Sequence, residues 1–165
     1  NGYRLKEKLP LNVGDFTVPL GKAEILRAGN DITVVSYGST LRIVSEAAEE
    51  LEQMGIHIEV IDPQTLYPFD NENICGQSLK KTSKLLIVDE DVPGGASAYI
   101  LQNILEAQNG YYSLDAQPKT LPAKEHRPPY GTDGDYFSKP SLDDVVEAVY
   151  NMMNEANPAK YPKLY

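Results

Sequence analysis

Residues 31–62 constrain the fold of this chain more than any other stretch. They read DITVVSYGSTLRIVSEAAEELEQMGIHIEVID, two β-branched apolar runs separated by a glycine and an amphipathic segment. The runs 32–37 and 56–61 predict two strands that are buried on both faces. Between them apolar residues recur at helical spacing, so we expect a helix that is capped by Ser39 or Thr40 and ends at the next glycine. Two strands joined by one helix lie parallel, with a right-handed crossover.

The remainder of the chain repeats this alternation of strands and helices. Asp70 or Asn71 is expected to cap a short helix, and Ser141 with Asp144 resembles a capping box. The expected pieces are, in order, an edge strand or a turn of helix at 23–27, a short helix around 74–81, a strand at 85–88, a helix at 96–108, a strand at 119–124 and a last helix through 145–153. This order predicts an α/β fold in three layers, with a doubly wound, mostly parallel open sheet of about five strands.

The chain divides into three expected segments. Residues 1–22 mix charge, proline and glycine and predict a surface lead-in or linker. Residues 23–156 form the α/β domain, and residues 157–165, with two prolines, form an extended tail. Because residue 1 is Asn rather than Met, we expect the chain to be a piece of a longer polypeptide.

Charge and composition exclude several classes of function. The formal net charge of -9 argues against nucleic acid or an anionic membrane as partner, because both carry phosphate. No apolar run approaches the roughly 20 residues that span a bilayer, and no signal peptide is visible. The single cysteine, Cys75, cannot form an internal disulfide, and no basic neighbour would activate it. We therefore expect a buried, inert thiol in a reducing compartment, the cytoplasm of a bacterium.

Two glycine-containing turns are the candidate ligand sites. Residues 37–40 (YGST) follow a strand and open a helix, where free amides can hold an anion, and residues 93–96 (PGGA) precede another helix. Neither matches the dinucleotide fingerprint or the Walker loop. Asp89, Glu90 and Asp91 could hold Mg²⁺, yet consecutive acids at a strand end point alternately and rarely converge. Both turns are therefore interpreted as ordinary strand–helix connections.

A loop histidine and the aromatic tail are the candidate partner contacts. His126 lies beside Arg127, with Tyr130 near, beyond the end of an expected strand. His57 lies within a strand pattern and is interpreted as a residue of the sheet margin. The chain has 11 tyrosines, and the tail that ends in Tyr165 predicts docking onto another chain, with a frayed end as the alternative.

An ordered set of short motifs resembles a known family. The set is PLGKA at 19–23, GND at 29–31, YG at 37–38, VID at 60–62, Thr65, PFD at 68–70 and a GG pair before a helix at 94–95. In this order it resembles the C-terminal domain of the transketolase family, most closely the β-subunit part of thiamine-diphosphate-dependent 2-oxo acid dehydrogenases of the pyruvate and branched-chain type. The resemblance covers most of residues 16–155. This chain has Pro63-Gln64 where that family usually has Leu-Arg, and the long loop near residues 124–140 replaces a Pro-Asp-Thr-Pro stretch.

The resemblance implies a non-catalytic assembly domain. The parent would decarboxylate a 2-oxo acid and pass the acyl group to lipoyl, as a separate β-subunit or an α/β fusion. In that family thiamine diphosphate and Mg²⁺ bind between two other domains, and the Gly-Asp-Gly motif that holds them has no counterpart here, since Gly134-Asp135 lacks its context. No catalytic, cofactor-binding or metal residue is carried over. The implied partners are other domains and subunits of the same homo-oligomeric enzyme and the acyltransferase core of the complex.

Two other functions remain open at this point. The first is a free-standing domain that binds a small ligand or a nucleotide at residues 37–40 and 93–96. The second is an independent hydrolase or lyase that uses His126 with Asp133 or Asp135.

Overall fold

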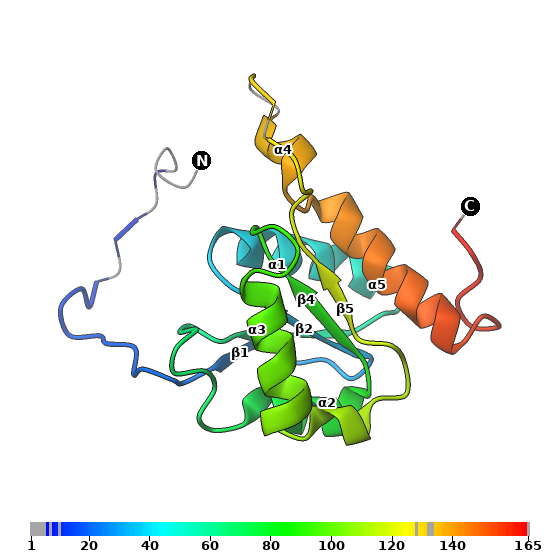
Figure 1. Ribbon diagram of the computed structural model, residues 1–165, viewed down its shortest axis with the longest axis horizontal. Helices are drawn as coiled ribbons and strands as arrows, with labels where there is room; N and C mark the ends of the chain where they lie inside the picture. Colours follow the sequence, from blue (N-terminus) through cyan, green and yellow to red (C-terminus); the bar gives the residue numbers. More distant parts are fainter. Residues whose placement is uncertain (1–5, 7, 10, 128, 132–133, 165) are drawn as a thin grey trace.

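The computed structural model describes residues 6, 8–9, 11–127, 129–131 and 134–164 (Figure 1). Its centre is a five-stranded sheet in the order β1-β3-β2-β4-β5. The strands are β1 (Glu24–Arg27), β2 (Ile32–Ser36), β3 (Ile58–Asp62), β4 (Leu85–Val88) and β5 (Lys119–Leu121). All neighbours pair in parallel except β1, which runs antiparallel to β3. The predicted mostly parallel, doubly wound sheet of about five strands is confirmed.

The central strands β2 and β4 are rich in β-branched and apolar residues. All five residues of β2 and all four of β4 are buried, as expected for strands covered on both faces. In the register, Val34 lies opposite Val60 of β3 and Leu86 of β4. The fourth parallel strand, expected at 119–124, ends at Leu121, because Pro122 has no N–H to offer the ladder.

The segment 23–27, for which strand and helix were both open, is the edge strand β1. It contains a bulge between Ile25 and Arg27. The turn after it packs tightly on β3: a Cβ atom on Gly29 would overlap the backbone of Ile58. This close approach explains why a residue without a side chain stands at that position.

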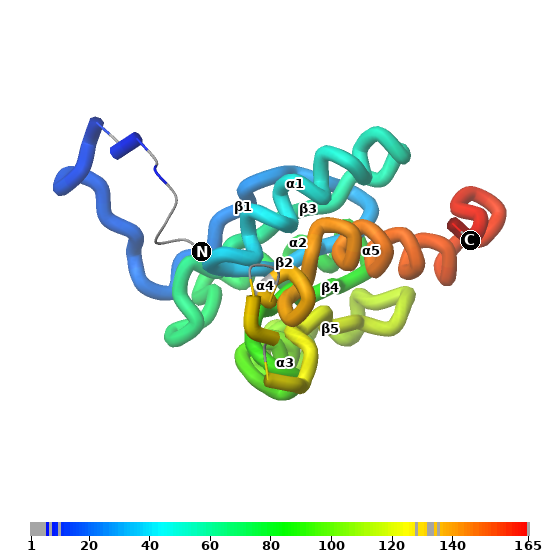
Figure 2. Tube along the Cα trace, turned by 90° about the horizontal axis from the view of Figure 1, so that it is seen from above, coloured from blue at the N-terminus to red at the C-terminus, as the bar shows by residue number. Residues whose placement is uncertain are grey.

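Helices cover both faces of the sheet. They are α1 (Ser39–Gln53), α2 (Ile74–Thr82), α3 (Ala96–Gln102), the π-turn η2 (Asn103–Ala107), the 3₁₀ turn η3 (Gly110–Ser113), α4 (Gly134–Ser138) and α5 (Leu142–Ala156). One buried cluster joins α1 and α5 to the sheet, through residues such as Leu51 and Val149. A second cluster joins α2 and α3 to the sheet, through residues such as Leu79 and Ile100. Figure 2 shows α1 and α3 on opposite sides of the strands, which gives the three expected layers.

The start of α5 follows the expected cap, and the start of α2 follows it in part. Ser141 accepts a hydrogen bond from the Asp144 amide, and the Asp144 carboxylate accepts one from the Ser141 amide, so the predicted capping box is confirmed. The N-cap residue of α2 is Asn73, whose side chain makes no capping bond, but the Asp70 carboxylate accepts hydrogen bonds from the backbone amides of Ile74 and Cys75 at the start of this helix.

The expected side-chain cap of α1 is wrong. Gly38 is the N-cap of that helix, with φ of 60°, and no side chain caps it. Ser39 is already the first helical residue, and the Thr40 hydroxyl instead donates back to the Tyr37 carbonyl at 2.8 Å. The left-handed conformation at Gly38 turns the chain directly from strand into helix, so no residue is left over to act as a side-chain cap.

The chain near the C-terminus turns back against the domain. Residues 158–160 form a turn, and the side-chain Nδ2 of Asn154 donates a hydrogen bond to the Tyr161 carbonyl at 2.5 Å. The Tyr161 ring is buried and packs edge-on against Tyr150 of α5, with centroids 6.2 Å apart. The tail is therefore not extended throughout, and this part of it covers the end of α5. Burial of the Tyr161 ring stabilises this arrangement by more than the conformational entropy that is lost when the tail becomes ordered.

Candidate functional site

The connections of β2 and β4 diverge at the carboxyl edge of the sheet. These two strands are parallel neighbours, but the chain continues from β2 through α1 to β3 and from β4 through α3 to β5, on the other side. In open α/β sheets the crevice between two such diverging connections is the usual place for a ligand. The predicted turn 37–40 and the loop 89–95 meet at this point, so it is the candidate site of the domain.

A buried carboxylate, Asp89, holds the two loops together. Its Oδ1 accepts a hydrogen bond from the Tyr37 hydroxyl at 2.7 Å and one from the Asp91 amide at 3.1 Å. Its Oδ2 accepts a hydrogen bond from the Ser97 amide at 2.9 Å, at the start of α3. Partial burial, followed by the hydrogen bond to Asp89, raises the pKa of Tyr37 far above its usual value. The phenol therefore stays a donor at neutral pH.

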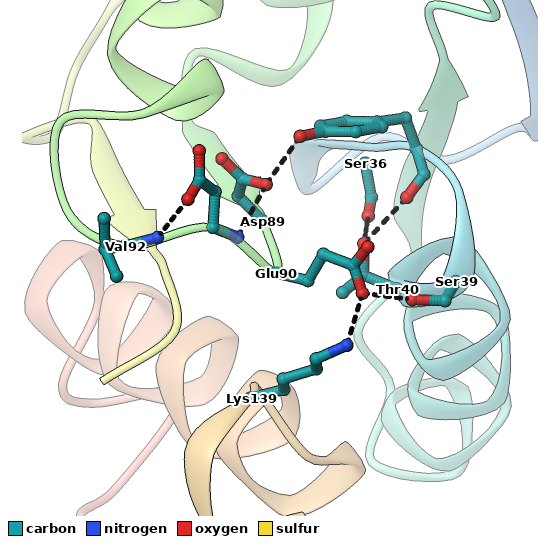
Figure 3. A network of polar contacts seen from close by, with 9 residues as sticks. Ser36, Ser39, Thr40, Asp89, Glu90, Val92 and Lys139 are labelled. Carbon is teal, nitrogen blue, oxygen red and sulfur yellow. Dashed lines mark hydrogen bonds and ion pairs between the residues drawn. The ribbon is translucent and has the colours of Figure 1, made fainter. Parts of the chain in front are cut away.

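A second carboxylate, Glu90, connects three separate parts of the chain. Its Oε2 accepts a hydrogen bond from the Ser39 hydroxyl at 2.6 Å and lies 2.8 Å from the Lys139 ammonium, which stands between α4 and α5. Figure 3 shows the Glu90 side chain between these two groups. The Lys139 hydrogen bond above all, and the one from Ser39, lower the pKa of Glu90, so the carboxylate is ionised at neutral pH.

The floor of the crevice is also occupied by the chain's own polar atoms. Ser36 Oγ, at the end of β2, lies 2.9 Å from Thr40 Oγ1 and 3.1 Å from the Val88 carbonyl. The Asp89 and Glu90 carboxylates likewise have partners within the domain (Figure 3). The first backbone amides of α1 have no side-chain cap. A ligand that bound through the side chains of this network would have to displace their internal bonds.

The three consecutive acids do not converge. Asp89 contacts Tyr37 and Ser97, Glu90 contacts Lys139, and Asp91 accepts a hydrogen bond from the Val92 amide at 2.8 Å. Within the described part of the chain, no group of three or more His, Cys, Asp or Glu side chains could hold a metal ion. The residues present therefore do not fit a Mg²⁺ site at this edge.

The predicted partner residues lie away from the crevice. His126, Arg127 and Tyr130 are exposed in the loop between β5 and α4. Tyr165, the fourth, lies outside the described residues, as does Asp133; Asp135 falls in α4.

His57 and Cys75 lie where the sequence predicts them, at the sheet margin and in the core. The backbone amide of His57, at the sheet margin, donates to the Asp31 carboxylate at 2.7 Å. Cys75 is fully buried, and burial, with the Asp70 carboxylate adding to it, raises the pKa of its thiol well above the usual value, as expected of an inert thiol.

Two residues of the network could not be assigned from the sequence. In the sequence, Tyr37 is only the start of a glycine turn, and Lys139 is only part of a long loop. The one sequence feature that points to both residues is the acidic triplet at 89–91. Its carboxylates require hydrogen-bond donors nearby, and Tyr37 and Lys139 provide them once β4 lies beside β2. That neighbourhood depends on the strand order, which alternation alone does not specify.

A cavity of about 370 Å³ lies at the β1 side of the sheet. Four of its lining residues are apolar, and Thr17, Lys22, Glu24 and Gln64 are its polar members. The apolar wall comes from Phe16, Val18 and Pro19 of the lead-in. This cavity is made by the chain segment that joins the domain at its N-terminal side.

Among the described helices, none is both long and apolar enough to cross a membrane.

The fold and the network define a class: a three-layer, doubly wound α/β domain whose carboxyl edge carries side chains that are hydrogen-bonded to one another. The chain belongs to the transketolase C-terminal domain family, whose model matches residues 21–137.

Proteins with similar sequences are subunits of oxidoreductases. The chain is 36% identical over 151 residues to the pyruvate dehydrogenase E1 component subunit beta of Mesostigma viride, covering 92% of this chain and 45% of that protein. It is 34% identical to the acetoin:2,6-dichlorophenolindophenol oxidoreductase subunit beta of Bacillus subtilis (strain 168), with 93% and 44% covered, and 39% identical to the 2-oxoisovalerate dehydrogenase subunit beta of the same organism, with 72% and 36% covered. The chain thus spans less than half the length of these relatives.

A solved structure shares the fold. An inactive beta4 tetramer of a split-gene transketolase superposes with a TM-score of 0.70 at 22% identity, covering 85% of this chain and 45% of that one.

Proposed function

We propose that this chain is the assembly domain of a thiamine-diphosphate-dependent 2-oxo acid dehydrogenase, in the β-subunit part of its decarboxylating component. The parent decarboxylates a 2-oxo acid and transfers the acyl group to lipoyl, in the cytoplasm of a bacterium. The reacting groups lie on other parts of the parent. Family membership and the pyruvate, 2-oxoisovalerate and acetoin enzymes among the relatives support this assignment.

The observation that carries the proposal is that the acidic side chains at the carboxyl edge are bonded to other residues of the domain. An enzyme or ligand-binding domain of this fold needs open polar groups there. In this chain Asp89 and Glu90 already bind Tyr37, Ser39 and Lys139. The network fixes loops to one another, which is what a supporting domain requires.

Thiamine diphosphate and Mg²⁺, which the resemblance implies for the parent, do not fit the described residues. The acids at 89–91 contact separate partners and do not converge on one point. The cofactor is therefore assigned to domains outside this chain.

An apolar surface around β1 supports the assembly role. Ile25 and Leu26 are 44% and 46% exposed, although both belong to a strand. The exposed side chains of Phe16 and Val18 line the cavity, and Leu20 of the same segment is exposed as well. Several large apolar side chains exposed along one segment and an edge strand are typical of a face that another domain or subunit covers. We assign it to contacts with the rest of a homo-oligomeric parent, which in turn docks on the acyltransferase core.

The test is reconstitution of the parent enzyme. The chain and the remainder of the parent polypeptide are prepared separately and assayed for 2-oxo acid decarboxylation with thiamine diphosphate and Mg²⁺. We expect turnover from neither alone and from the mixture. Leu26→Glu abolishes the recovery, because it places a charge in the covered surface. Met54→Glu does not, although Met54, at the end of α1, is 45% exposed and matches Leu26 in accessibility.

Two results would overturn the proposal. The first is turnover by the isolated chain. The second is stabilisation of the isolated chain by a nucleotide in a thermal-shift screen, which would favour a free-standing nucleotide-binding domain instead.

A further inference from the structure

The outer edge of β1 has no strand beside it within the described part of the chain. In the sheet order, β1 is the last strand on its side and pairs only with β3. Figures 1 and 2 show the lead-in leaving the domain ahead of β1 and running away from the sheet. A free edge of this kind presents unpaired backbone N–H and C=O groups, which can pair with a strand of another chain.

The middle of β1 is apolar and open to solvent. Natural sheets protect a free edge with charges, a bulge or a covering segment. β1 has a charge at each end and a bulge at Leu26, but Ile25 and Leu26 between the charges are both large, apolar and nearly half exposed. The bulge limits how many residues can pair, so this edge favours a short contact with one partner strand.

The Glu24 carboxylate has no cation beside it among the described residues. Its register partner on β3 is another acid, Asp62, and like charges directly opposite one another destabilise a pair of strands. Burial above all, and then the Glu24 charge, raise the pKa of Asp62, although its hydrogen bond from the Gln64 amide lowers it. A cation supplied by another chain would relieve this repulsion.

The sequence of β1 supplies such a cation when two copies meet. β1 reads Glu-Ile-Leu-Arg, which is complementary to itself in the reverse direction. When two copies lie antiparallel about a two-fold axis between Ile25 and Leu26, Glu24 of each copy lies opposite Arg27 of the other, and the apolar residues face each other. No like charges meet in this register, whose flanking pairs are Ala23 with Ala28 and Lys22 with Gly29.

Arg27 has donors left for a second carboxylate. Its side chain is about a third exposed and donates to Glu52 of α1 through one NH₂ group at 2.7 Å. A guanidinium has five N–H donors, so others remain for an acid that approaches the edge. The charged groups around this edge are Lys22 and Arg27 against Glu24, Asp62 and Glu52. The partner is therefore selected by the opposed Glu24–Arg27 pairs and not by the summed charge.

We propose that β1 pairs edge to edge with β1 of a second copy of this chain, antiparallel and about a two-fold axis. The inference rests on the proposed function and deepens it, because it names the occupant of the β1 part of the apolar surface. Two four-residue edges bury less than the about 1,000 Å² of a stable interface. The isolated chain is therefore monomeric at micromolar concentration and dimerises only near millimolar, whereas other contacts in the parent raise the effective concentration of the second copy.

The experiment is sedimentation equilibrium of the chain from about 10 µM to about 1 mM, in about 0.15 M salt, which screens long-range repulsion between the acidic copies. We expect a monomer–dimer equilibrium. Glu24→Arg should weaken dimerisation about tenfold, because each dimer contains the opposed pair twice. Net charge alone predicts the opposite, since this variant is less acidic than the wild type and repels its own copy less.

A mixture of two variants gives the sharpest comparison. Arg27→Glu alone should also weaken dimerisation about tenfold, because acids then face acids. When E24R and R27E chains are mixed, every acid of one edge faces an arginine of the other, and dimerisation should recover to within about twofold of the wild type.

Glu147→Arg is the matched control. It makes the same change of charge as Glu24→Arg at an exposed position of α5, a helix that is ion-paired to β5 at the opposite edge of the sheet through Lys119 and Glu155. This variant should dimerise at least as tightly as the wild type. Thermal unfolding of each variant checks that the fold persists, which we expect for Glu24→Arg because Glu24 is exposed and the Arg27–Glu52 bond is kept.

Three outcomes would overturn the inference. They are the absence of a dimer up to about 1 mM, unchanged dimerisation of the Glu24→Arg variant, and failure of the mixed variants to recover it. Each of them leaves the reconstitution test of the proposed function unaffected, since a different domain of the parent would then cover β1. Conversely, failed reconstitution with the expected response to Glu24→Arg would count against the proposed function alone.

Discussion

The buried carboxylate of Asp89 offers the sharpest test of the network at the carboxyl edge. Asp89→Asn keeps the size of the side chain and leaves Oδ1 as an acceptor for the Tyr37 hydroxyl. In the wild type, the Ser97 amide donates to Asp89 Oδ2 at 2.9 Å. The substitution replaces this oxygen by an NH₂ group, so that two hydrogen-bond donors face each other. Ser97 is fully buried, and water cannot replace the lost bond.

The magnitude follows from these contacts. A hydrogen bond to a charged group contributes about 2 kcal/mol, and an unsatisfied buried donor costs about 1 kcal/mol or more. We therefore expect Asp89→Asn to lower the free energy of unfolding by about 3 kcal/mol. Tyr37→Phe removes only the bond of a half-buried hydroxyl and should cost about 1 kcal/mol.

The assay is urea unfolding followed by circular dichroism, with the slope of the transition compared between variants. Asp143→Asn is the control, because Asp143 is exposed in the first turn of α5 and should change stability by about 0.5 kcal/mol or less. A loss below about 1 kcal/mol for Asp89→Asn, with an unchanged slope, would refute the account of Asp89 as the residue that holds the two loops together.

Three further predictions follow from single contacts. Gly29→Ala should destabilise the fold by about 2 kcal/mol in urea unfolding, because a Cβ there overlaps the backbone of Ile58; a neutral change would contradict that packing. Ser141→Ala should cost about 1 kcal/mol in the same assay by removing one half of the capping box, and no loss would mean that the box is not a stabilising feature. Burial alone would raise the pKa of Glu59, but hydrogen bonds led by that of Lys81 outweigh it and the pKa lies below the usual 4.5. The ionised form is thus favoured in the folded state, so its contribution is present above pH 4.5 and is lost as the pH falls through the lower folded pKa. Melting temperatures across this range should fall less steeply for Glu59→Gln than for the wild type, and parallel curves would contradict the assignment.

Most elements of the fold could be predicted from patterns of residues that lie close together in the sequence. The β-branched run at 32–36 and the apolar run at 85–88 could be assigned as buried strands because burial on both faces favours β-branched and apolar residues. The start of α5 could be assigned because the capping box is formed by residues three apart, within one turn. Such features depend on neighbours in the sequence and need no knowledge of the sheet order.

The candidate site could be predicted only in part, because its contacts are long-range. The turn 37–40 was identified from its glycine, but its partners Asp89 and Lys139 come from other elements. Their meeting depends on β4 lying beside β2 rather than beside β3, and both orders satisfy the same alternation of strands and helices. The expected cap of α1 failed for a local reason, since a positive φ at Gly38 is a backbone choice that composition does not reveal.

Whether the surface around β1 is covered in the parent enzyme is the most direct test of the central claim that this chain is an assembly domain. Hydroxyl-radical footprinting read by mass spectrometry compares the isolated chain with the assembled parent. We predict that labelling of Ile25 and Leu26 falls strongly on assembly, while labelling of Met54, equally exposed in the isolated chain, does not change. Equal labelling of Ile25 and Leu26 in both states would contradict the claim.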